Sequence, residues 1–304
     1  MKNNFWQQAH FVSRDPGLVW KKDKRVMIDP SGPLDNFWAL TPNVVKISEG
    51  YRMFYTGVTR EKRMQGCLGY ILSATSFDGV SWIKDTGISV DNFPGGGELW
   101  VLCPDVISLP DGRWRMYFQA KGLSGFDKIF SAVSADAFIW QMENGIRFSD
   151  PSHDCGSPRC LILPDGRYRL YFHFRNNHEH HIMSAVSRDG LEFVQEPGVR
   201  ITRETELEAH TVYAPEVLQL GTGGYRLYYA AWADVPRQGR ILSAHSDDGL
   251  TWQKDGVVCV DVGGCGQEIK VSEPCVMELS DGTFRMYYEA CDAQGDWRIF
   301  SATA

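Results

Sequence analysis

One motif recurs five times along this 304-residue chain: an apolar, strand-like segment that ends in a Ser-Ala pair. The copies lie at Ser73-Ala74, Ser131-Ala132, Ser184-Ala185, Ser243-Ala244 and Ser301-Ala302. Neighbouring copies are 53 to 59 residues apart. A period of this length indicates supersecondary units that stack along a line or circle an axis, so the repeat constrains the fold before any single residue does.

The other parts of the repeat predict what each unit contains. An aromatic-Arg-apolar-aromatic run precedes each Ser-Ala pair, and such runs favour β-strands. The runs begin at Tyr51, Trp114, Tyr168, Tyr225 and Phe284. Turns that contain glycine precede the runs, and turns such as Asp189-Gly190 follow the Ser-Ala pairs, with Asp136-Ala137 as a degenerate copy. Each unit is therefore predicted to hold four antiparallel strands.

The fifth copy ends at Ala304 after three strands, and its fourth strand is predicted at the other end of the chain. Residues 13–20 resemble residues 187–193, which follow the Ser-Ala pair of the third copy. The N-terminal strand would then close a ring, which removes exposed sheet edges. The prediction is an all-β, five-bladed β-propeller in one domain. Its blades span about 35–90, 97–147, 153–200, 208–260, and 268–304 plus 11–28.

Composition excludes several classes of partner. The net charge of −7 argues against nucleic acid, and no stretch of about 18 apolar residues predicts a membrane span. The first residues lack an apolar leader, so a cytoplasmic location is expected, and secretion of a trimmed mature form is the open alternative. The eight cysteines are scattered without a Cys-x-x-Cys pair and are predicted to be reduced, buried thiols.

Comparing the copies separates structural residues from candidate functional ones. The five arginines and the Asp-Gly turns recur, so they are predicted to be structural. The residue after a shared proline in the first strand of each unit does not recur, and in propellers this strand lines the central channel. These residues are Asn43, Asp105, Arg159, Glu216 and Cys275.

The segments that lead to these prolines also differ between copies. They carry carboxylates, imidazoles, aromatic rings and one amine: Asp35, Trp38, Glu98, Trp100, His153, Asp154, Glu208, His210, Tyr213, Glu268 and Lys270. Aromatic faces stack on sugar rings and charged groups bind hydroxyls, so we expect a sugar pocket at the channel mouth. The alternative is that these groups fill the channel by pairing with one another and with water.

The segments at 164–172 and 184–193 resemble the five-bladed glycoside hydrolases, a superfamily of arabinanases, xylosidases, fructosidases and intracellular mannoside phosphorylases. The resemblance covers the whole chain and implies cleavage of a glycosidic bond in a small carbohydrate by carboxylates from different blades. Asp105, in Cys103-Pro104-Asp105-Val106, matches one family element. Thr41, Ser157 and Tyr213 stand where arabinanase-like members carry their other acids.

Other carboxylates must therefore act if the chain is an enzyme of this kind. Glu273 alone occupies the position before the shared proline with a carboxylate, and Asp154 lies shortly before the third proline. We predict that Asp154 and Glu273 form the acid and base pair, with Glu98 or Asp35 as a modulator.

Several alternatives stay open. Residues 246–252 resemble the Asp-box of sialidases, and a propeller with lyase or isomerase chemistry, or one that only binds sugar, fits the repeat as well. The run from His178 to His181 has side chains that bind transition metals, although a solvated or substrate-facing loop is favoured. No cofactor is expected, and a structural Ca²⁺ in the channel is an option because oxygen ligands are plentiful there.

Overall fold

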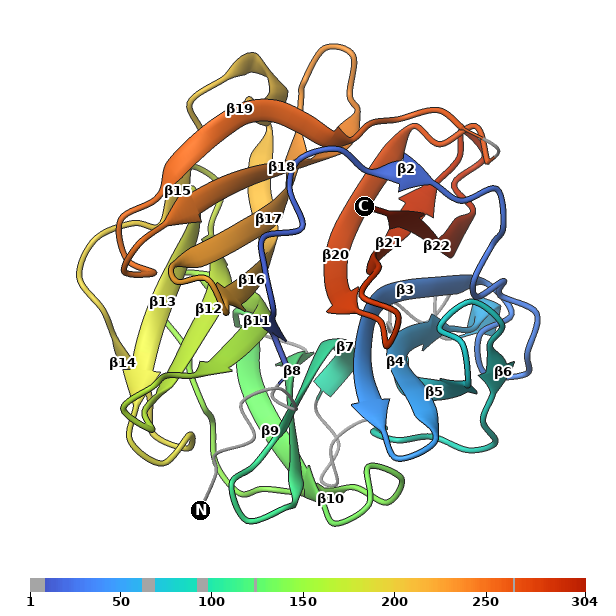
Figure 1. The fold of residues 1–304 in the computed structure, drawn as a ribbon, viewed down its shortest axis with the longest axis horizontal. Helices are drawn as coiled ribbons and strands as arrows, with labels where there is room; N and C mark the ends of the chain where they lie inside the picture. The colour runs from blue at the N-terminus through green and yellow to red at the C-terminus, as the bar shows by residue number, and fades with distance from the viewer. Residues whose placement is uncertain (1–8, 62–68, 92–97, 123–124, 265) are drawn as a thin grey trace.

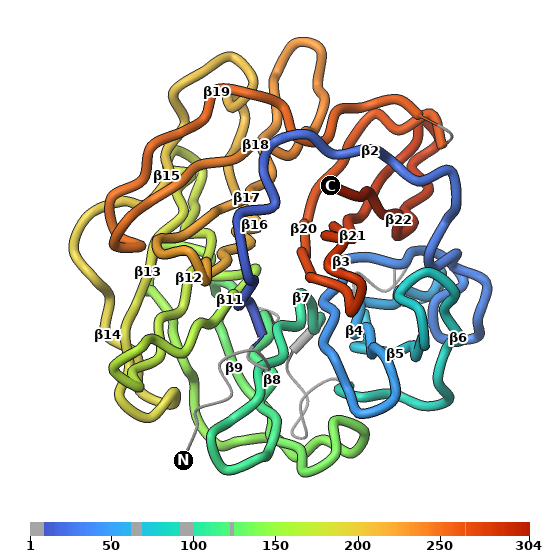
Figure 2. The backbone as a smooth tube through the Cα atoms, in the orientation of Figure 1, coloured from blue at the N-terminus to red at the C-terminus, as the bar shows by residue number. Residues whose placement is uncertain are grey.

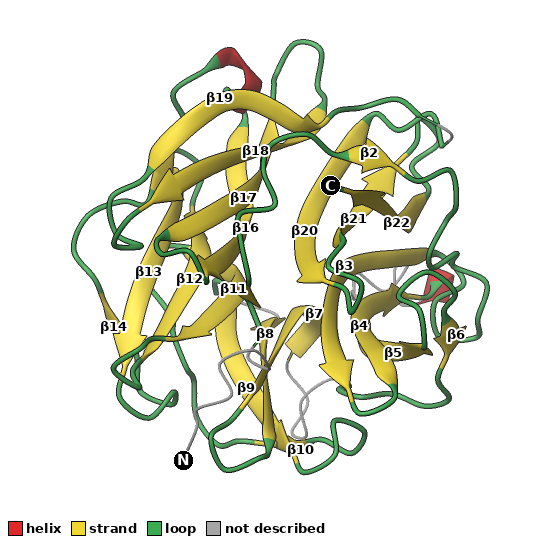
Figure 3. Cartoon of the chain, in the orientation of Figure 1, coloured by secondary structure: helices red, strands yellow, loops and turns green. Residues whose placement is uncertain are grey.

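The protein is built almost entirely of β-strands, as predicted (Figure 3). A computed structural model describes residues 9–61, 69–91, 98–122, 125–264 and 266–304. Unit 1 contains β3 (Trp38–Ile47), β4 (Gly50–Val58), β5 (Tyr70–Ser76) and β6 (Ile83–Lys84). Unit 2 contains β7 (Glu98–Ser108), β8 (Trp114–Gly122), β9 (Lys128–Ser134) and β10 (Gln141–Met142).

The later units follow the same order. Unit 3 contains β11 (Asp154–Ile162), β12 (Tyr168–Arg175), β13 (His180–Ser187) and β14 (Val194–Gln195), with β15 (Ile201–Thr202) also on β13. A 3-10 helix at Glu206–Glu208 precedes unit 4, which contains β16 (Thr211–Leu220), β17 (Tyr225–Trp232), β18 (Gly239–Ser246) and β19 (Gln253–Val260). Unit 5 contains β20 (Lys270–Glu278), β21 (Phe284–Cys291) and β22 (Trp297–Thr303).

The first strands of the units surround a central axis (Figure 1). Strand β3 contacts β7, β7 contacts β11, β11 contacts β16, β16 contacts β20, and β20 contacts β3. Within the described residues the strands form four hydrogen-bonded sheets, because a single parallel bridge between Gly239 and Lys270 joins units 4 and 5. The ring is therefore completed by packing between units and not by one continuous sheet.

The N-terminal segment supplies the outer strand of unit 5. Strand β2 (Lys21–Lys22) pairs antiparallel with β22, as predicted for the closing strand. Before it, β1 (Phe11–Val12) pairs in parallel with the end of β16, a contact that the sequence analysis did not predict. Figure 2 shows this blue segment passing beside β16 toward the middle of the ring. The N-terminal segment thus pairs with both unit 4 and unit 5.

A buried ion cluster recurs in the described units and explains the five repeated arginines. The arginine lies on the second strand, the serine of the Ser-Ala pair lies on the third, and the carboxylate lies in or just after the fourth strand. The clusters are Arg52–Ser73–Asp85, Arg115–Ser131–Glu143, Arg169–Ser184–Glu196, Arg226–Ser243–Asp255 and Arg285–Ser301–Asp23. Because Asp23 follows β2, the N-terminal segment completes the fifth cluster. The prediction that these arginines are structural is confirmed.

Tyrosines on the second strands join each unit to the next. Their hydroxyls donate hydrogen bonds to turn glycine carbonyls of the neighbouring unit: Tyr117 to Gly190 (2.8 Å), Tyr171 to Gly249 (2.8 Å), Tyr228 to Gly17 (2.6 Å) and Tyr287 to Gly79 (2.7 Å). Unit 1 has Phe54 in this position, and its ring packs edge-on against Trp140 beside the degenerate turn. Ala137 there keeps the left-handed backbone (φ 61°) that Gly190 adopts (φ 73°).

The six described cysteines are free and buried: Cys103, Cys155, Cys160, Cys259, Cys275 and Cys291. Their predicted state as buried thiols is confirmed, while Cys67 and Cys265 lie outside the described residues. In the part of the chain that the structure describes, no helix has the length and apolar character needed to cross a membrane.

Candidate active site

The residues after the shared prolines connect neighbouring units around the axis. Four of them accept a backbone amide hydrogen bond from the next unit: Asn43 from Val106 (3.0 Å), Asp105 from Cys160 (2.7 Å), Glu216 from Val276 (2.8 Å) and Cys275 from Val44 (3.2 Å). The fifth, Arg159, donates its Nε to Glu216 at 2.9 Å. Five different side chains therefore perform one shared structural task, although their chemistry does not repeat.

His10 from the N-terminal segment enters the same layer. Its Nε2 lies 2.7 Å from a carboxylate oxygen of Asp105, and its Nδ1 lies 3.6 Å from one of Glu216. Arg159 completes a buried group of two cations and two carboxylates. Burial by itself lowers the pKa of His10, but the attraction of Asp105 and Glu216 is larger and raises it to about 10. This pairing fits the alternative in which channel groups neutralise one another, and substrate contact by Asp105, Arg159 and Glu216 stays a prediction.

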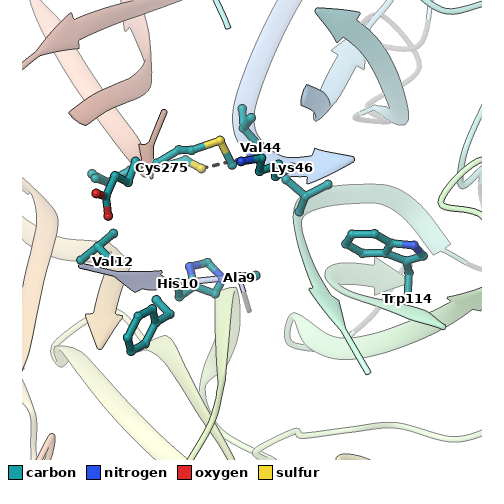
Figure 4. Close-up of a pocket in the computed structure, with 12 residues that line it drawn as sticks. Ala9, His10, Val12, Val44, Lys46, Trp114 and Cys275 are labelled. Atoms are coloured by element: carbon teal, nitrogen blue, oxygen red, sulfur yellow. Dashed lines mark hydrogen bonds between the residues drawn. The ribbon is translucent and has the colours of Figure 1, made fainter. Parts of the chain in front are cut away.

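A small cavity of about 70 Å³ adjoins His10 (Figure 4). Segments around 9–12, 44–46 and 275–278 line it, together with Trp114, so it lies toward the C-terminal ends of the first strands. The Trp and carboxylate candidates of the predicted mouth lie at the opposite, N-terminal ends of these strands. This cavity is therefore separate from the predicted sugar pocket.

Three predicted site carboxylates belong to a second recurring cluster. Asp35 accepts hydrogen bonds from Tyr55 (3.0 Å) and Lys84 (2.5 Å). Glu208 accepts them in the same way from Tyr229 (2.7 Å) and Lys254 (2.8 Å). Glu268 lies 3.5 Å from Lys22, in the unit whose second strand carries Tyr288 at this position. Because the arrangement recurs, it fits a structural role better than a role for Asp35, Glu208 or Glu268 at one central site.

The residue before each shared proline adopts a left-handed backbone. The φ angles are 50° at Thr41, 54° at Cys103, 45° at Ser157, 51° at Ala214 and 50° at Glu273. At each of these places the strand pairing shifts register, which marks a β-bulge. Left-handed non-glycine residues are strained, but fivefold recurrence makes this bulge part of the fold. The side chains at these five bulge positions differ, and only Glu273 is a carboxylate.

Glu273 is buried near the axis with an incomplete set of partners. Its Oε1 accepts a hydrogen bond from Ser157 Oγ at 2.8 Å and lies 3.9 Å from Cys103 Sγ. Its Oε2 has no hydrogen-bond partner among the described residues. Burial raises the pKa of Glu273, and the positive charge of Arg159 opposes the rise only in part. A buried carboxyl with one free oxygen is suited to proton transfer with a ligand.

A second buried carboxyl, Glu289, lies close enough to interact electrostatically with Glu273. It accepts hydrogen bonds from Ser272 Oγ (2.7 Å) and from the backbone N–H of Thr41 (2.9 Å). Burial and the nearby Glu273 raise its pKa to about 8. The raised pKa favours the protonated form of this carboxyl at neutral pH.

Glu289 was not predicted, because it lies on a second strand and the predicted site residues lie on or just before first strands. The second strands also carry non-recurring residues at one position. The residues that pair opposite the position two before the proline are Thr56, Gln119, His173, Ala230 and Glu289, and they do not recur. The repeat therefore holds a sequence signal for Glu289: a residue that differs between copies at an equivalent position of the second strand.

Another layer of non-recurring residues lies toward the N-terminal ends of the first strands. Paired across the first two strands, these residues are Trp38 with Val58, Trp100 with Lys121, Asp154 with Arg175, Thr211 with Trp232, and Lys270 with Cys291. We call these ten residues the mouth layer. It contains three tryptophans and three cations, so the predicted Trp38, Trp100, Asp154 and Lys270 do share one level of the ring.

The side chain of Asp154 forms hydrogen bonds with two residues of unit 2. It accepts hydrogen bonds from the backbone N–H of Asp127 (2.8 Å) and from Lys121 (3.1 Å). Asp127 in turn accepts a hydrogen bond from Trp100 Nε1 at 3.0 Å, and burial raises its pKa. The predicted partnership of Asp154 with Glu273 stays a prediction. The side chain of Glu98 lies outside the described residues.

The remaining predicted residues lie on units 3 and 4. His153 hydrogen-bonds Glu179 (2.8 Å) and stacks on Phe174, whereas His210 stacks on Trp232 and lies 3.1 Å from Asp234. Tyr213 packs edge-on against Trp232. The described residues contain no group of three or more His, Cys, Asp or Glu side chains arranged to hold a metal ion.

Solved structures share the fold of this chain. A glycoside hydrolase superposes with a TM-score of 0.77 at 16% identity, covering 94% of this chain and 92% of that one. A thermostable family-43 glycoside hydrolase gives a TM-score of 0.73 at 19% identity over 89% and 91%. A structure from a family of mannoside phosphorylases that contains glycoside hydrolases targeting β-1,2 mannosidic linkages gives 0.71 at 14% identity over 97% and 96%. The fold is that of the propeller-type glycoside hydrolases.

Sequence comparisons do not name an activity. No protein-family model matches the chain. Two uncharacterized proteins of Mycobacterium tuberculosis match parts of it. The protein of strain CDC 1551 is 27% identical over 164 residues, which are 50% of this chain and 52% of that protein. The protein of strain H37Rv is 35% identical over 118 residues, or 38% and 36%. The chain therefore spans about half the length, or less, of the curated relatives it matches.

Proposed function

We propose that the chain is a five-bladed β-propeller enzyme that cleaves a glycosidic bond of a small carbohydrate. Units 1 to 5 would be the blades, and β2 would close the last one. The fold likeness to glycoside hydrolases supports the class, and the non-recurring residues at one end of the ring support a single central site. A lectin-like propeller would instead repeat its binding residues in every blade.

The buried pair of Glu273 and Glu289 carries the proposal. Glycoside cleavage needs one carboxyl that holds a proton for the leaving oxygen and one that acts as base or nucleophile. The raised pKa of Glu289 favours its protonated form at neutral pH for the reasons given above. Glu273 has a free oxygen, and it accepts a hydrogen bond from Ser157 and lies near Arg159, both of which favour its ionised form. We assign Glu289 as the general acid and Glu273 as its partner.

Asp154 is the alternative partner of Glu273, as the sequence analysis proposed. It lies in the mouth layer, one level nearer the entrance than Glu289 by strand position. Its close contact with Lys121 suits a carboxylate that orients substrate or stabilises positive charge. If Glu289 is the partner of Glu273, Glu289→Gln should abolish turnover. If Asp154 is the partner, Asp154→Asn should abolish it.

The test measures hydrolysis of a panel of aryl glycosides, with and without phosphate, by Glu273→Gln, Glu289→Gln and Asp154→Asn. We expect the first two to lower kcat by about 10²- to 10⁴-fold, because that is the usual contribution of general acid-base catalysis. Glu192→Gln, an exposed turn residue, is the matched control for the amide substitution. Glu208→Gln tests a recurring structural acid and should lower stability more than kcat.

Full turnover by both Glu273→Gln and Glu289→Gln would refute the assignment. A loss confined to Asp154→Asn and Glu273→Gln would favour the alternative pair. Turnover that requires phosphate would identify phosphorolysis.

A further inference from the structure

Two cations of the mouth layer have no close carboxylate partner. Arg175, whose side chain is 39% exposed, has its nearest recorded carboxylate oxygen on Asp154 at 4.0 Å. In the part of the chain that the structure describes, Lys270 makes no ion pair, and its ammonium lies 4.5 Å from the ring centre of Trp232. The third cation, Lys121, is paired with Asp154 at 3.1 Å. The recurring arginines, by contrast, are all paired.

Aromatic side chains lie between Arg175 and Lys270. The Trp232 ring has the Lys270 ammonium 4.5 Å and the stacked His210 ring 6.0 Å from its centre, and it packs edge-on against Tyr213 at 5.9 Å between ring centres. The ring centres of Tyr213 and His173 lie 6.5 Å apart. His173 is two residues before Arg175 on β12. Burial raises the pKa of Tyr213 and lowers the pKa of His173. The positive charge of Arg175 lowers both pKa values, so Arg175 lies near both side chains. Two cations therefore flank one aromatic surface.

His173 adds neutral hydrogen-bonding capacity beside that surface. It is 3% exposed, and neither ring nitrogen has a hydrogen-bond partner among the described residues. Burial, with the charges of Arg175 and His180, holds its pKa well below the usual value, so the ring is neutral and offers one donor and one acceptor. Buried polar atoms without partners are rare in folded proteins and suit a ligand hydroxyl.

The local charge balance favours an anion. Asp154 is neutralised by Lys121, and the raised pKa of Glu289, below the mouth layer, favours its protonated form. Two other buried carboxyls interact with Arg175: Glu273, which also has Arg159 near it, and Asp127, whose pKa burial raises. The protein therefore compensates the charge of Arg175 only in part, and among the described residues it provides no ion pair for Lys270.

We propose that the substrate is an acidic glycoside whose carboxylate is bound by Arg175 and Lys270 while its ring lies against Tyr213, beside Trp232. The inference rests on the proposed function. A guanidinium binds a carboxylate through two parallel hydrogen bonds, and aromatic side chains pack against the apolar side of a sugar ring. Free phosphate shares this oxyanion chemistry, but its higher charge would meet the Glu273 carboxylate. We therefore assign the anionic group to the sugar.

Two measurements test the inference. The first compares kcat/KM for 4-nitrophenyl glucuronides and galacturonides with the matching glucosides and galactosides, both anomers of each. The second uses calorimetry to compare binding of glucuronate, galacturonate, glucose and inorganic phosphate. We expect at least a tenfold preference for the acidic member of one pair in turnover, and tighter binding of its free uronate than of glucose or phosphate.

Substitutions of Arg175 and Lys270 test whether these two residues cause the preference for the acidic glycoside. Arg175→Gln and Lys270→Met should each lower kcat/KM for the acidic glycoside at least tenfold more than for the neutral one. Arg188→Gln, an exposed arginine in the turn after β13, should leave the preference unchanged. Arg175→Lys, which keeps the charge but loses the paired hydrogen bonds, should fall between wild type and Arg175→Gln.

The outcomes separate this inference from the proposed function. Efficient turnover of neutral glycosides with no uronate preference overturns the inference and leaves the proposed function intact. Uronate binding that Arg175→Gln weakens, without turnover of any glycoside, supports the inference and refutes the proposed function. Phosphate binding tighter than uronate, weakened by the same variants, overturns the inference in favour of a phosphate co-substrate.

Discussion

Removing the charge of His10 should destabilise the ring, because His10 balances two buried carboxylates. Asp105 and Glu216 are fully buried and face two cations, His10 and Arg159. The substitution His10→Gln keeps a hydrogen-bond donor for Asp105 but leaves one buried negative charge without a partner. Breaking a buried ion pair from one side costs about 3–5 kcal/mol.

The pKa of His10 gives an independent magnitude. A rise from 6.5 to about 10 corresponds to about 5 kcal/mol of preference for the charged imidazole in the folded state. Because the folded pKa is raised, this stabilisation is complete below pH 6.5 and is lost as the pH rises through about 10. The difference between wild type and His10→Gln should therefore shrink by about 1.4 kcal/mol per pH unit across that window.

Urea denaturation of both proteins at pH 6, 8 and 9.5 measures this difference. Comparing the two proteins at each pH cancels the titration of other groups, and Arg188→Gln controls for loss of one positive charge at the surface. A difference below about 1 kcal/mol at pH 6, or one that stays constant up to pH 9.5, would show that His10 does not hold its proton through Asp105 and Glu216.

Three further predictions follow from recurring contacts and buried groups. Tyr171→Phe should cost about 1 kcal/mol of unfolding free energy, because it removes the hydrogen bond to Gly249; chemical denaturation measures it, and no loss would mean that the contact between units is dispensable. If Glu289 is the general acid, kcat should fall as pH rises through about 8, where that carboxyl loses its proton; a pH-rate profile checks this, and a plateau up to pH 10 would exclude Glu289. Asp23→Asn should destabilise by about 3 kcal/mol, since it leaves the buried Arg285 without its carboxylate; thermal unfolding reports it, and a change under about 0.5 kcal/mol would contradict the role of the N-terminal segment in closing the ring.

The candidate site was only partly predictable from the sequence. Comparison of the copies predicted Trp38, Trp100, Asp154 and Lys270 at one level, because residues at equivalent places in a repeat fall at equivalent heights on the ring. It grouped them with Asp35 and Glu208, since one strand cannot show that Tyr55 and Tyr229 recruit these acids into recurring clusters. It omitted Glu289, which reaches the axis from a second strand.

The sequence by itself determined the all-β class, the strand order and the closure of the last unit by the N-terminal strand. These follow from local patterns, because turn residues and alternating apolar residues recur at a nearly constant spacing. Only the tertiary structure decided which charges face one another. The pairing of His10 with Asp105, and the nearness of Glu273 to Glu289, join segments far apart in the chain. Burial and electrostatic neighbours set the protonation of such groups, and no sequence spacing encodes either.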